Sequence, residues 1–115
     1  MWWDGSKNRW NLLCHQYNMT DAAHQYLDGG FAVSNSEDLW GGWSWGAWEQ
    51  PAYTALVNYT NGSSDVMTRR ERPFVLFGSD GKPEVLYTAV SPPGDTHNAN
   101  CYTIANPLKP VLPVV

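Results

Sequence analysis

The most chemically distinctive stretch of the sequence is a short charged run directly before an apolar segment. It reads Arg69-Arg70-Glu71-Arg72-Pro73, one carboxylate among three arginines, and Phe74-Val75-Leu76-Phe77 follows it. Nearby cations favour the ionised carboxylate, so Glu71 is predicted to carry a negative charge. Pro73 would fix the backbone where a strand begins and hold Glu71 in a defined place. A solvated cluster of ion pairs is the alternative, and it is the commoner meaning of a charge run.

Histidine supplies the second candidate. His15 closes an apolar stretch, and on an alternating strand it would point away from Cys14, which makes it a candidate substrate contact. A lone histidine in a strand is nevertheless more often a structural residue. His24 and His97 stand in polar, loop-like surroundings, and no histidine has a companion at metal-binding spacing. The sequence therefore predicts no metal site.

Tryptophan is concentrated in one segment. Residues 40–48 read Trp-Gly-Gly-Trp-Ser-Trp-Gly-Ala-Trp, and such a segment could form a loop that displays flat apolar faces to sugar rings. Trp40, Trp43 and Trp45 are accordingly predicted to contact a carbohydrate. The alternative is that these side chains fill space inside the core. No serine-nucleophile elbow, phosphate-binding loop or dinucleotide fingerprint occurs, which sets aside serine hydrolase and nucleotide chemistry and leaves no cofactor to expect.

The composition favours a single folded domain that binds neither nucleic acid nor a membrane. The chain has 115 residues, a formal net charge of −4, 16% charged residues and 14% aromatic residues. Nucleic-acid and anionic-membrane binding call for clustered lysine and arginine. No apolar run approaches the roughly 18 residues that span a bilayer. The oligomeric state is left open by the sequence.

The glycosylation sequons indicate a secreted parent protein. Asn18, Asn58 and Asn61 each begin an Asn-x-Ser/Thr sequon, more than the roughly one match that chance would give. Residues 1–5 lack the basic and apolar regions of a signal peptide. We therefore expect the upstream part of a longer, secreted chain to be missing. The two cysteines at positions 14 and 101 either pair or stay reduced, and the sequence does not decide between these states.

The segments that must position these residues are short strands separated by turn signals. We expect strands at 9–17, 31–34, 53–59, 65–69, 74–77, 84–90 and 101–104. Asn61-Gly62 predicts a type I′ hairpin, and Gly78 to Pro83 predicts another hairpin. The one helix candidate, residues 21–27, is too short and too polar to be stable. Three prolines make residues 106–115 a loose, extended tail.

A weak internal repeat separates the possible all-β folds, which are a sandwich, a barrel and a propeller. The pattern of apolar strand, Asp-Gly turn and apolar strand begins at Trp2 and again at Phe74, roughly 75 residues later. We therefore predict an all-β fold in which residues 1–105 form a partial β-propeller of about two blades of antiparallel strands. The tail 106–115 follows it. A small β-sandwich fits the strand count almost as well.

In combination these motifs resemble the five-bladed β-propeller glycosidases, namely family 43 glycoside hydrolases and their relatives among arabinanases, invertases and levansucrases. The similarity covers roughly residues 1–90. It lies in Glu71-x-Pro73 before an apolar strand, in Asp80-Gly81, and in Gly29-Gly30-Phe31-Ala32-Val33-Ser34 with Asp38-Leu39-Trp40 after it. The resemblance implies that Glu71 is the general acid. The substrate-binding residues expected with it are His15, Trp40, Trp43, Trp45, Arg70 and Arg72.

The resemblance also implies that part of the catalytic apparatus is absent. In the family, one Asp on the first blade is the base or nucleophile and a second Asp, in an Asp-Pro motif, tunes it; both would lie upstream of Trp2. Phe31 and Asn11 stand where histidines are usual, whereas His15 matches. Because glycoside hydrolysis needs an acid and a second carboxylate, we expect a glycosidase-like fragment that is inactive by itself. Two alternatives stay open: a non-catalytic carbohydrate-binding β-domain, and a structural or protein-binding β-domain with a tryptophan core.

Overall fold

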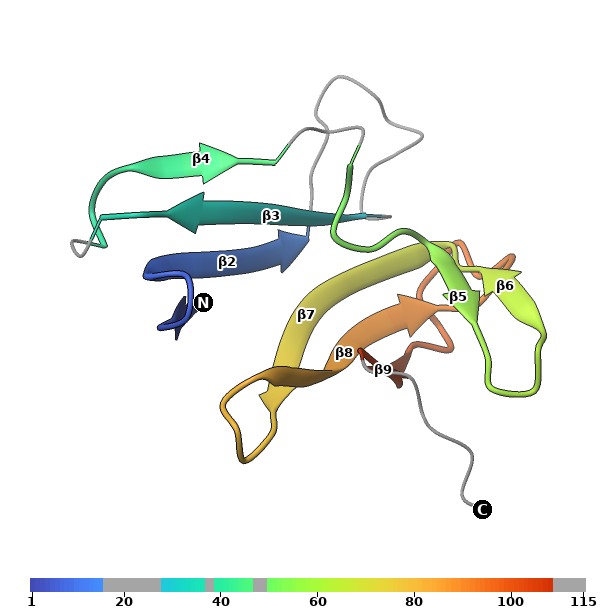
Figure 1. The fold of residues 1–115 in the computed structure, drawn as a ribbon. Helices are drawn as coiled ribbons and strands as arrows, with labels where there is room; N and C mark the ends of the chain where they lie inside the picture. The colour runs from blue at the N-terminus through green and yellow to red at the C-terminus, as the bar shows by residue number, and fades with distance from the viewer. Residues whose placement is uncertain (16–27, 37–38, 47–49, 109–115) are drawn as a thin grey trace, which may run out of the picture.

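The computed structural model describes residues 1–15, 28–36, 39–46 and 50–108 (Figure 1). All regular structure in these residues is strand, arranged in three antiparallel sheets. The all-β prediction is therefore confirmed. The helix candidate at 21–27 and most of the expected tail, 109–115, lie outside the described residues. No helix among the described residues has the length and apolarity needed to cross a membrane.

The N-terminal sheet is a four-stranded meander in which each strand pairs with the next. Its strands are β1 (Trp2–Asp4), β2 (Arg9–His15), β3 (Gly29–Ser34) and β4 (Trp43–Trp45). The turn between β1 and β2 ends at Asn8, which takes a left-handed φ of 49°, a conformation that asparagine tolerates better than most residues. Trp3 lies opposite Trp10, Trp10 opposite Ser34 and Ser34 opposite Trp43. Side chains opposite one another share a face, so this register decides which residues meet.

The C-terminal half forms a second meander and a separate hairpin. The meander consists of β7 (Arg69–Phe77), β8 (Pro83–Ser91) and β9 (Tyr102–Pro107), and the hairpin consists of β5 (Leu56–Asn58) and β6 (Ser64–Val66). Figure 1 shows the long β7–β8 hairpin between the N-terminal sheet and the β5–β6 hairpin. On one side β2 lies next to β7, and the ring centroids of Trp2 and Phe77 are 5.7 Å apart.

The buried core lies on the other side, between the β5–β6 hairpin and the C-terminal meander. Val57 of β5 and Met67 pack against Val90 of β8 and Ile104 of β9, and Tyr59 lies against this cluster. A two-stranded hairpin is marginal in water, so this apolar contact is what keeps β5 and β6 in place.

Gly29 brings the start of β3 close to the segment before β5. Its amide donates to the Tyr53 carbonyl at 2.8 Å, and its carbonyl accepts from the Ala52 amide at 2.8 Å. The Tyr53 ring lies directly over Gly29, where a side-chain Cβ would overlap the ring atoms. Glycine is therefore required here for close approach and not for a turn.

The two hairpins predicted from glycine turns are present, but Asn61-Gly62 does not form a type I′ turn. That turn needs positive φ at both residues, and only Gly62, at 85°, has it. The Tyr59 amide donates to the Ser63 carbonyl at 2.9 Å, which closes a three-residue loop with glycine in the left-handed position. The Asn61 side chain accepts from the Ser63 amide at 3.0 Å and so caps the loop. Gly81, with a φ of 72°, occupies the same position between β7 and β8.

Two other segments differ from expectation. Residues 43–45, expected in a loop because glycine surrounds them, form β4, since Trp43 and Trp45 alternate with Ser44 along an edge that β3 leaves open for pairing. At the other end β9 extends to Pro107, so the first residues of the expected tail belong to the sheet.

Candidate functional site

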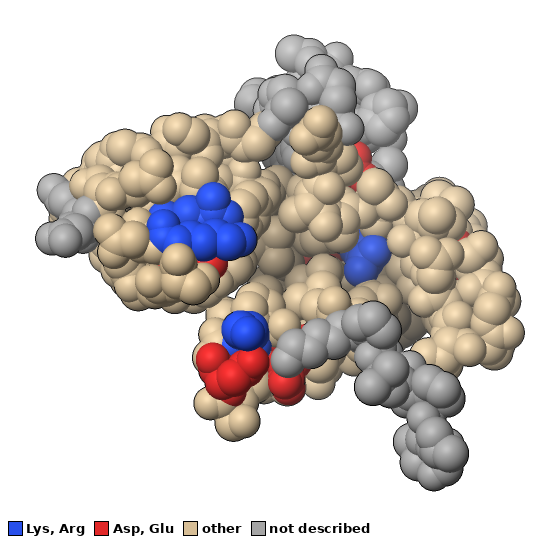
Figure 2. Space-filling model, viewed as in Figure 1, with Lys and Arg blue, Asp and Glu red and all other residues tan. Residues whose placement is uncertain are grey.

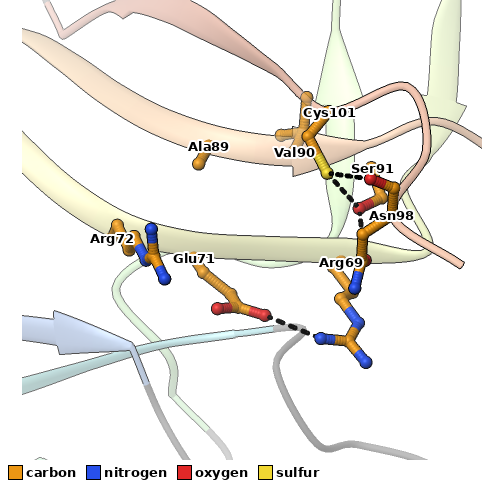
Figure 3. Close-up of a pocket in the computed structure, with 8 residues that line it drawn as sticks. All are labelled: Arg69, Glu71, Arg72, Ala89, Val90, Ser91, Asn98 and Cys101. Atoms are coloured by element: carbon orange, nitrogen blue, oxygen red, sulfur yellow. Dashed lines mark hydrogen bonds and ion pairs between the residues drawn. The ribbon is translucent and has the colours of Figure 1, made fainter.

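Glu71, the proposed acid, lies in a small cavity on the C-terminal meander. The side chain is 19% exposed, and its Oε1 lies 3.6 Å from Nη1 of Arg69, the residue two positions before it on the same face of β7. The cavity, of about 200 Å³, is also bordered by Arg72, Ser91 and Cys101. Figure 3 shows the ion pair extending from β7, with the Ser91–Cys101 contact, 3.3 Å long, at the β8–β9 side.

A β-bulge follows Glu71 and fixes its position. Glu71 pairs with Ala89 and Phe74 with Tyr87, so two residues of β7, Arg72 and Pro73, face a single residue of β8. Proline has no N–H to donate to a neighbouring strand. It fits here because a residue in a bulge does not have to make a ladder hydrogen bond. Arg72 takes a left-handed φ of 52°, a conformation that costs a non-glycine residue about 1–2 kcal/mol. Strained residues of this kind are concentrated at functional sites, which keeps Glu71 a candidate.

Arg70, an expected substrate contact, points the opposite way and is buried in the fold. Its guanidinium donates four hydrogen bonds to groups of β5, β8, β9 and the segment before β5. The acceptors are Thr54 O (2.8 Å), Leu56 O (3.3 Å), Thr88 Oγ1 (3.1 Å) and Asn106 Oδ1 (2.7 Å). The guanidinium carbon also lies 4.8 Å from the centre of the Tyr53 ring, a cation–π distance. This geometry gives Arg70 a structural role, since its donors are directed to the fold and not to the Glu71 cavity.

The expected tryptophan contacts lie on the N-terminal sheet. The strand register places Trp43 and Trp45 of β4 on the same face as Trp3 of β1 and Trp10 of β2. We call these four residues the tryptophan face. The Trp3 and Trp10 rings meet edge to face with centroids 5.3 Å apart, and Trp45 is 64% exposed. Trp40, in the connection before β4, is 93% exposed.

The structure divides the predicted site residues into separate groups. Glu71 is grouped with Arg69 and Arg72, whereas Trp43 and Trp45 belong to the tryptophan face. His15 is exposed at the end of β2. The described residues that line the Glu71 cavity include neither histidine nor tryptophan. The expectation that Glu71 shares its concavity with His15 or with a tryptophan of the 40–48 segment finds no support in this lining.

Sequence reasoning missed Trp3 and Trp10 as functional candidates. The signal was present, because both residues lie in strands that flank a short turn ending in Asn8. If β1 and β2 pair across that turn, Trp3 and Trp10 face each other. Their meeting with Trp43, however, depends on β3 and on a fourth strand that was expected to be a loop.

The chemistry available at Glu71 is limited by its neighbours. Among the described residues that line its cavity, Glu71 is the one carboxylate. An acid and a second carboxylate are both needed for glycoside hydrolysis. No group of three or more histidine, cysteine, aspartate or glutamate side chains in the described part of the chain could hold a metal ion. The described residues of this cavity therefore do not supply the pair of carboxylates that glycoside hydrolysis needs.

Comparisons with known proteins give no match: no family model matches the chain, and neither the curated proteins nor the solved structures contain a match to it. The likeness to family 43 glycosidases thus depends on the sequence motifs alone.

Proposed function

We propose that this chain binds carbohydrate through the tryptophan face and does not hydrolyse it. The observation that carries the proposal is the convergence of Trp3, Trp10, Trp43 and Trp45 on one side of a four-stranded sheet. An indole presents a large, flat apolar surface and one polar N–H, which suits the C–H face and the hydroxyl edge of a sugar ring. Trp45, on the edge strand, is well exposed for stacking, and we expect it to contribute most.

The relation to a family 43-type propeller is part of this proposal. In it, the β1–β4 meander and the β7–β9 meander are two blades, and Glu71 is the remaining family carboxylate. What supports it is that each half of the internal repeat forms a hairpin, β1–β2 and β7–β8, that opens an antiparallel meander. A secreted, glycosylated parent protein is proposed with it, and the exposure of Asn58 and Asn61 agrees with use of their sequons.

Replacement of Trp45 by alanine tests the proposal. Arabinan, xylan and fructan oligosaccharides are titrated into the protein, and binding is followed by tryptophan fluorescence and calorimetry. We expect at least one neutral sugar to bind and Trp45→Ala to weaken it about tenfold, which corresponds to about 1.4 kcal/mol. Phe74→Ala is the matched control, because Phe74 is an aromatic residue on β7 with the same exposure, 63% against 64%. Equal binding by Trp45→Ala and the wild-type protein would refute the role of the tryptophan face.

A further inference from the structure

The opposite face of the N-terminal sheet borders a second, larger hollow. Trp2, Arg9 and Asn11 alternate with the tryptophan face along β1 and β2, and Phe31 of β3 lies on the same side as they do. These side chains line a hollow of about 840 Å³, a size usual for ligand sites. Its other wall is the tip of the β7–β8 hairpin, and Figure 2 shows lysine and arginine on the sheet side facing the mixed charges of that tip.

Two hydrogen-bond donors in this hollow are buried and have no acceptor in the part of the chain that the structure describes. Asn11 is 2% exposed, and its Nδ2 makes no hydrogen bond; Nε of Arg9, two residues earlier on the same face, makes none either. Within the described residues neither side chain has a hydrogen bond or an ion pair. A buried donor without an acceptor destabilises a protein by about 1–3 kcal/mol. Such groups are rare in folded proteins, and a ligand that supplies acceptor oxygens relieves that penalty.

The charges around the hollow favour an anionic acceptor. Three cations, Lys7, Arg9 and Lys82, and two carboxylates, Asp4 and Asp80, line it, a net charge of +1. Both carboxylates already have partners in the fold. Asp4 Oδ1 accepts from Ser6 N (3.1 Å) and Ser6 Oγ (2.6 Å). Asp80 accepts from Lys82 N (3.0 Å) and lies 3.8 Å from Lys82 Nζ. The hydrogen bonds from Ser6 lower the pKa of Asp4, so this carboxylate stays ionised and does not act as a donor to a ligand. Lys82 is paired with Asp80, so Lys7 and Arg9 are the cations available to an incoming anion, and of these two Arg9 has the buried donor without an acceptor among the described residues.

An apolar wall stands beside these donors. The rings of Trp2 and Phe31 are tilted against each other with centroids 6.2 Å apart, and both are half-buried. A ligand that satisfies the whole hollow must combine a flat C–H face with a carboxylate. We propose that this hollow binds a uronic-acid residue of an acidic oligosaccharide. Its carboxylate accepts hydrogen bonds from Arg9 and Asn11, and its ring lies against Trp2 and Phe31. This site is on the opposite side of the sheet from Trp10, Trp43 and Trp45; of the tryptophan face, Trp3 is the member that also lines the hollow, and the proposal does not use it.

Calorimetry with a matched pair of sugars tests the site: a xylo-oligosaccharide with one glucuronic acid branch and the same xylo-oligosaccharide without it. We expect the acidic sugar to bind at least tenfold more tightly, with the difference reduced by added salt, because a charge-assisted pair carries it. Arg9→Gln should abolish the difference, and Arg9→Lys should restore it only in part, since lysine lacks the forked donors. Phe74→Ala, which changes an exposed residue of β7 that does not line the hollow, is the control and should keep the difference.

Asn11→Leu gives a second measurement that a merely structural role would not produce. Because leucine has a similar size and no donor to satisfy, the variant should melt at a higher temperature than the wild-type protein and yet lose the preference for the acidic sugar. Equal affinity for the two sugars, or competition by acetate as strong as by the acidic sugar, would overturn the proposal. The Trp45→Ala variant distinguishes this site from the tryptophan face. If this variant loses binding of the neutral sugar and keeps the preference for the acidic sugar, both sites are supported. If Trp45→Ala shows that the tryptophan face does not bind neutral sugar, the comparison of acidic and neutral sugars in the Arg9 variants is unaffected.

Discussion

Tyr53 is an ionisable side chain buried beside a permanent positive charge. It is buried, its hydroxyl has no hydrogen-bond partner among the described residues, and its ring lies beside the Arg70 guanidinium. Burial raises the pKa of Tyr53 well above its usual value of about 10, against the opposing attraction of the Arg70 charge. The folded state therefore holds this proton at a pH where the unfolded chain has released it.

The stability of the protein should fall at alkaline pH for this reason. Below about pH 10 both states keep the Tyr53 proton and its contribution is complete; as the pH rises from about 10 toward the folded pKa, only the unfolded state ionises, so the free energy of unfolding decreases. Urea unfolding between pH 7 and pH 11 should show this decrease, and Tyr53→Phe should reduce its slope. Tyr59, whose pKa is raised to about 12, chiefly by a hydrogen bond with Tyr102, should leave a residual slope. A Tyr53→Phe variant with the wild-type slope would contradict the assignment, and Tyr87→Phe serves as the control.

The charged run at 69–73 shows what sequence can predict about single residues. It correctly placed Glu71 near the start of a strand with arginine beside it. It did not predict that Arg69 and Arg70 have different roles. Their roles differ because side chains alternate along a strand, which places Arg69 and Glu71 on one face of β7 and Arg70 on the other. The left-handed Arg72 was also beyond prediction, since the bulge arises from the pairing of β7 with β8.

Among the secondary-structure elements, the β5–β6 hairpin depends most on its neighbours. Arg70 of β7 donates to two backbone carbonyls, those of Thr54 and Leu56, and at the same time to Thr88 of β8 and Asn106 of β9. One side chain thus joins the start of the hairpin to the C-terminal meander. Because an arginine is always charged and planar, the four acceptors are matched by a fixed fork of donors that lysine does not provide.

Arg70→Met should therefore destabilise the protein by about 3 kcal/mol, since it leaves buried acceptors without donors. Arg72→Met, two residues away and exposed, should change the free energy of unfolding by less than about 0.5 kcal/mol. Chemical denaturation followed by tryptophan fluorescence measures both values. Similar losses in the two variants would show that Arg70 does not join the sheets as described.

The strands could be predicted where the signal for a strand lies in consecutive residues. The strands expected at 9–17, 84–90 and 101–104 correspond to β2, β8 and β9, with residues 16–17 outside the described residues, and the glycines at 62 and 81 formed hairpin loops. β4 was not predictable, because its three residues have no strand signal apart from their pairing with β3. The tryptophan face could not be predicted from consecutive residues for the same reason, because its members come from β1, β2 and β4.

For the whole molecule, the question is whether the sheets bring together the two carboxylates that hydrolysis needs. A retaining glycosidase places its carboxylates about 5–5.5 Å apart and an inverting one about 6.5–9.5 Å apart. Two of the other described aspartates, Asp80 and Asp95, are engaged elsewhere. Asp95 accepts from the amides of Asn100, Ala99 and His97, which lower its pKa, and Asp80 lies at the hairpin tip beside Lys82.

The 115-residue chain should consequently show no glycosidase turnover above background. Incubation of the purified protein with arabinoside, xyloside and fructoside substrates, followed by quantification of released reducing sugar, measures this directly. Glu71→Gln should be indistinguishable from the wild-type protein, because the described residues that line the Glu71 cavity include no second carboxylate to act as nucleophile or to activate water. Sugar binding at the tryptophan face should persist in that variant, since Glu71 lies on a different sheet.

Turnover by the wild-type protein that disappears in Glu71→Gln would mean that a second carboxylate reaches this cavity, and the binding function would then have to be revised to a catalytic one. Turnover that survives the substitution would point to a contaminating enzyme or to another site.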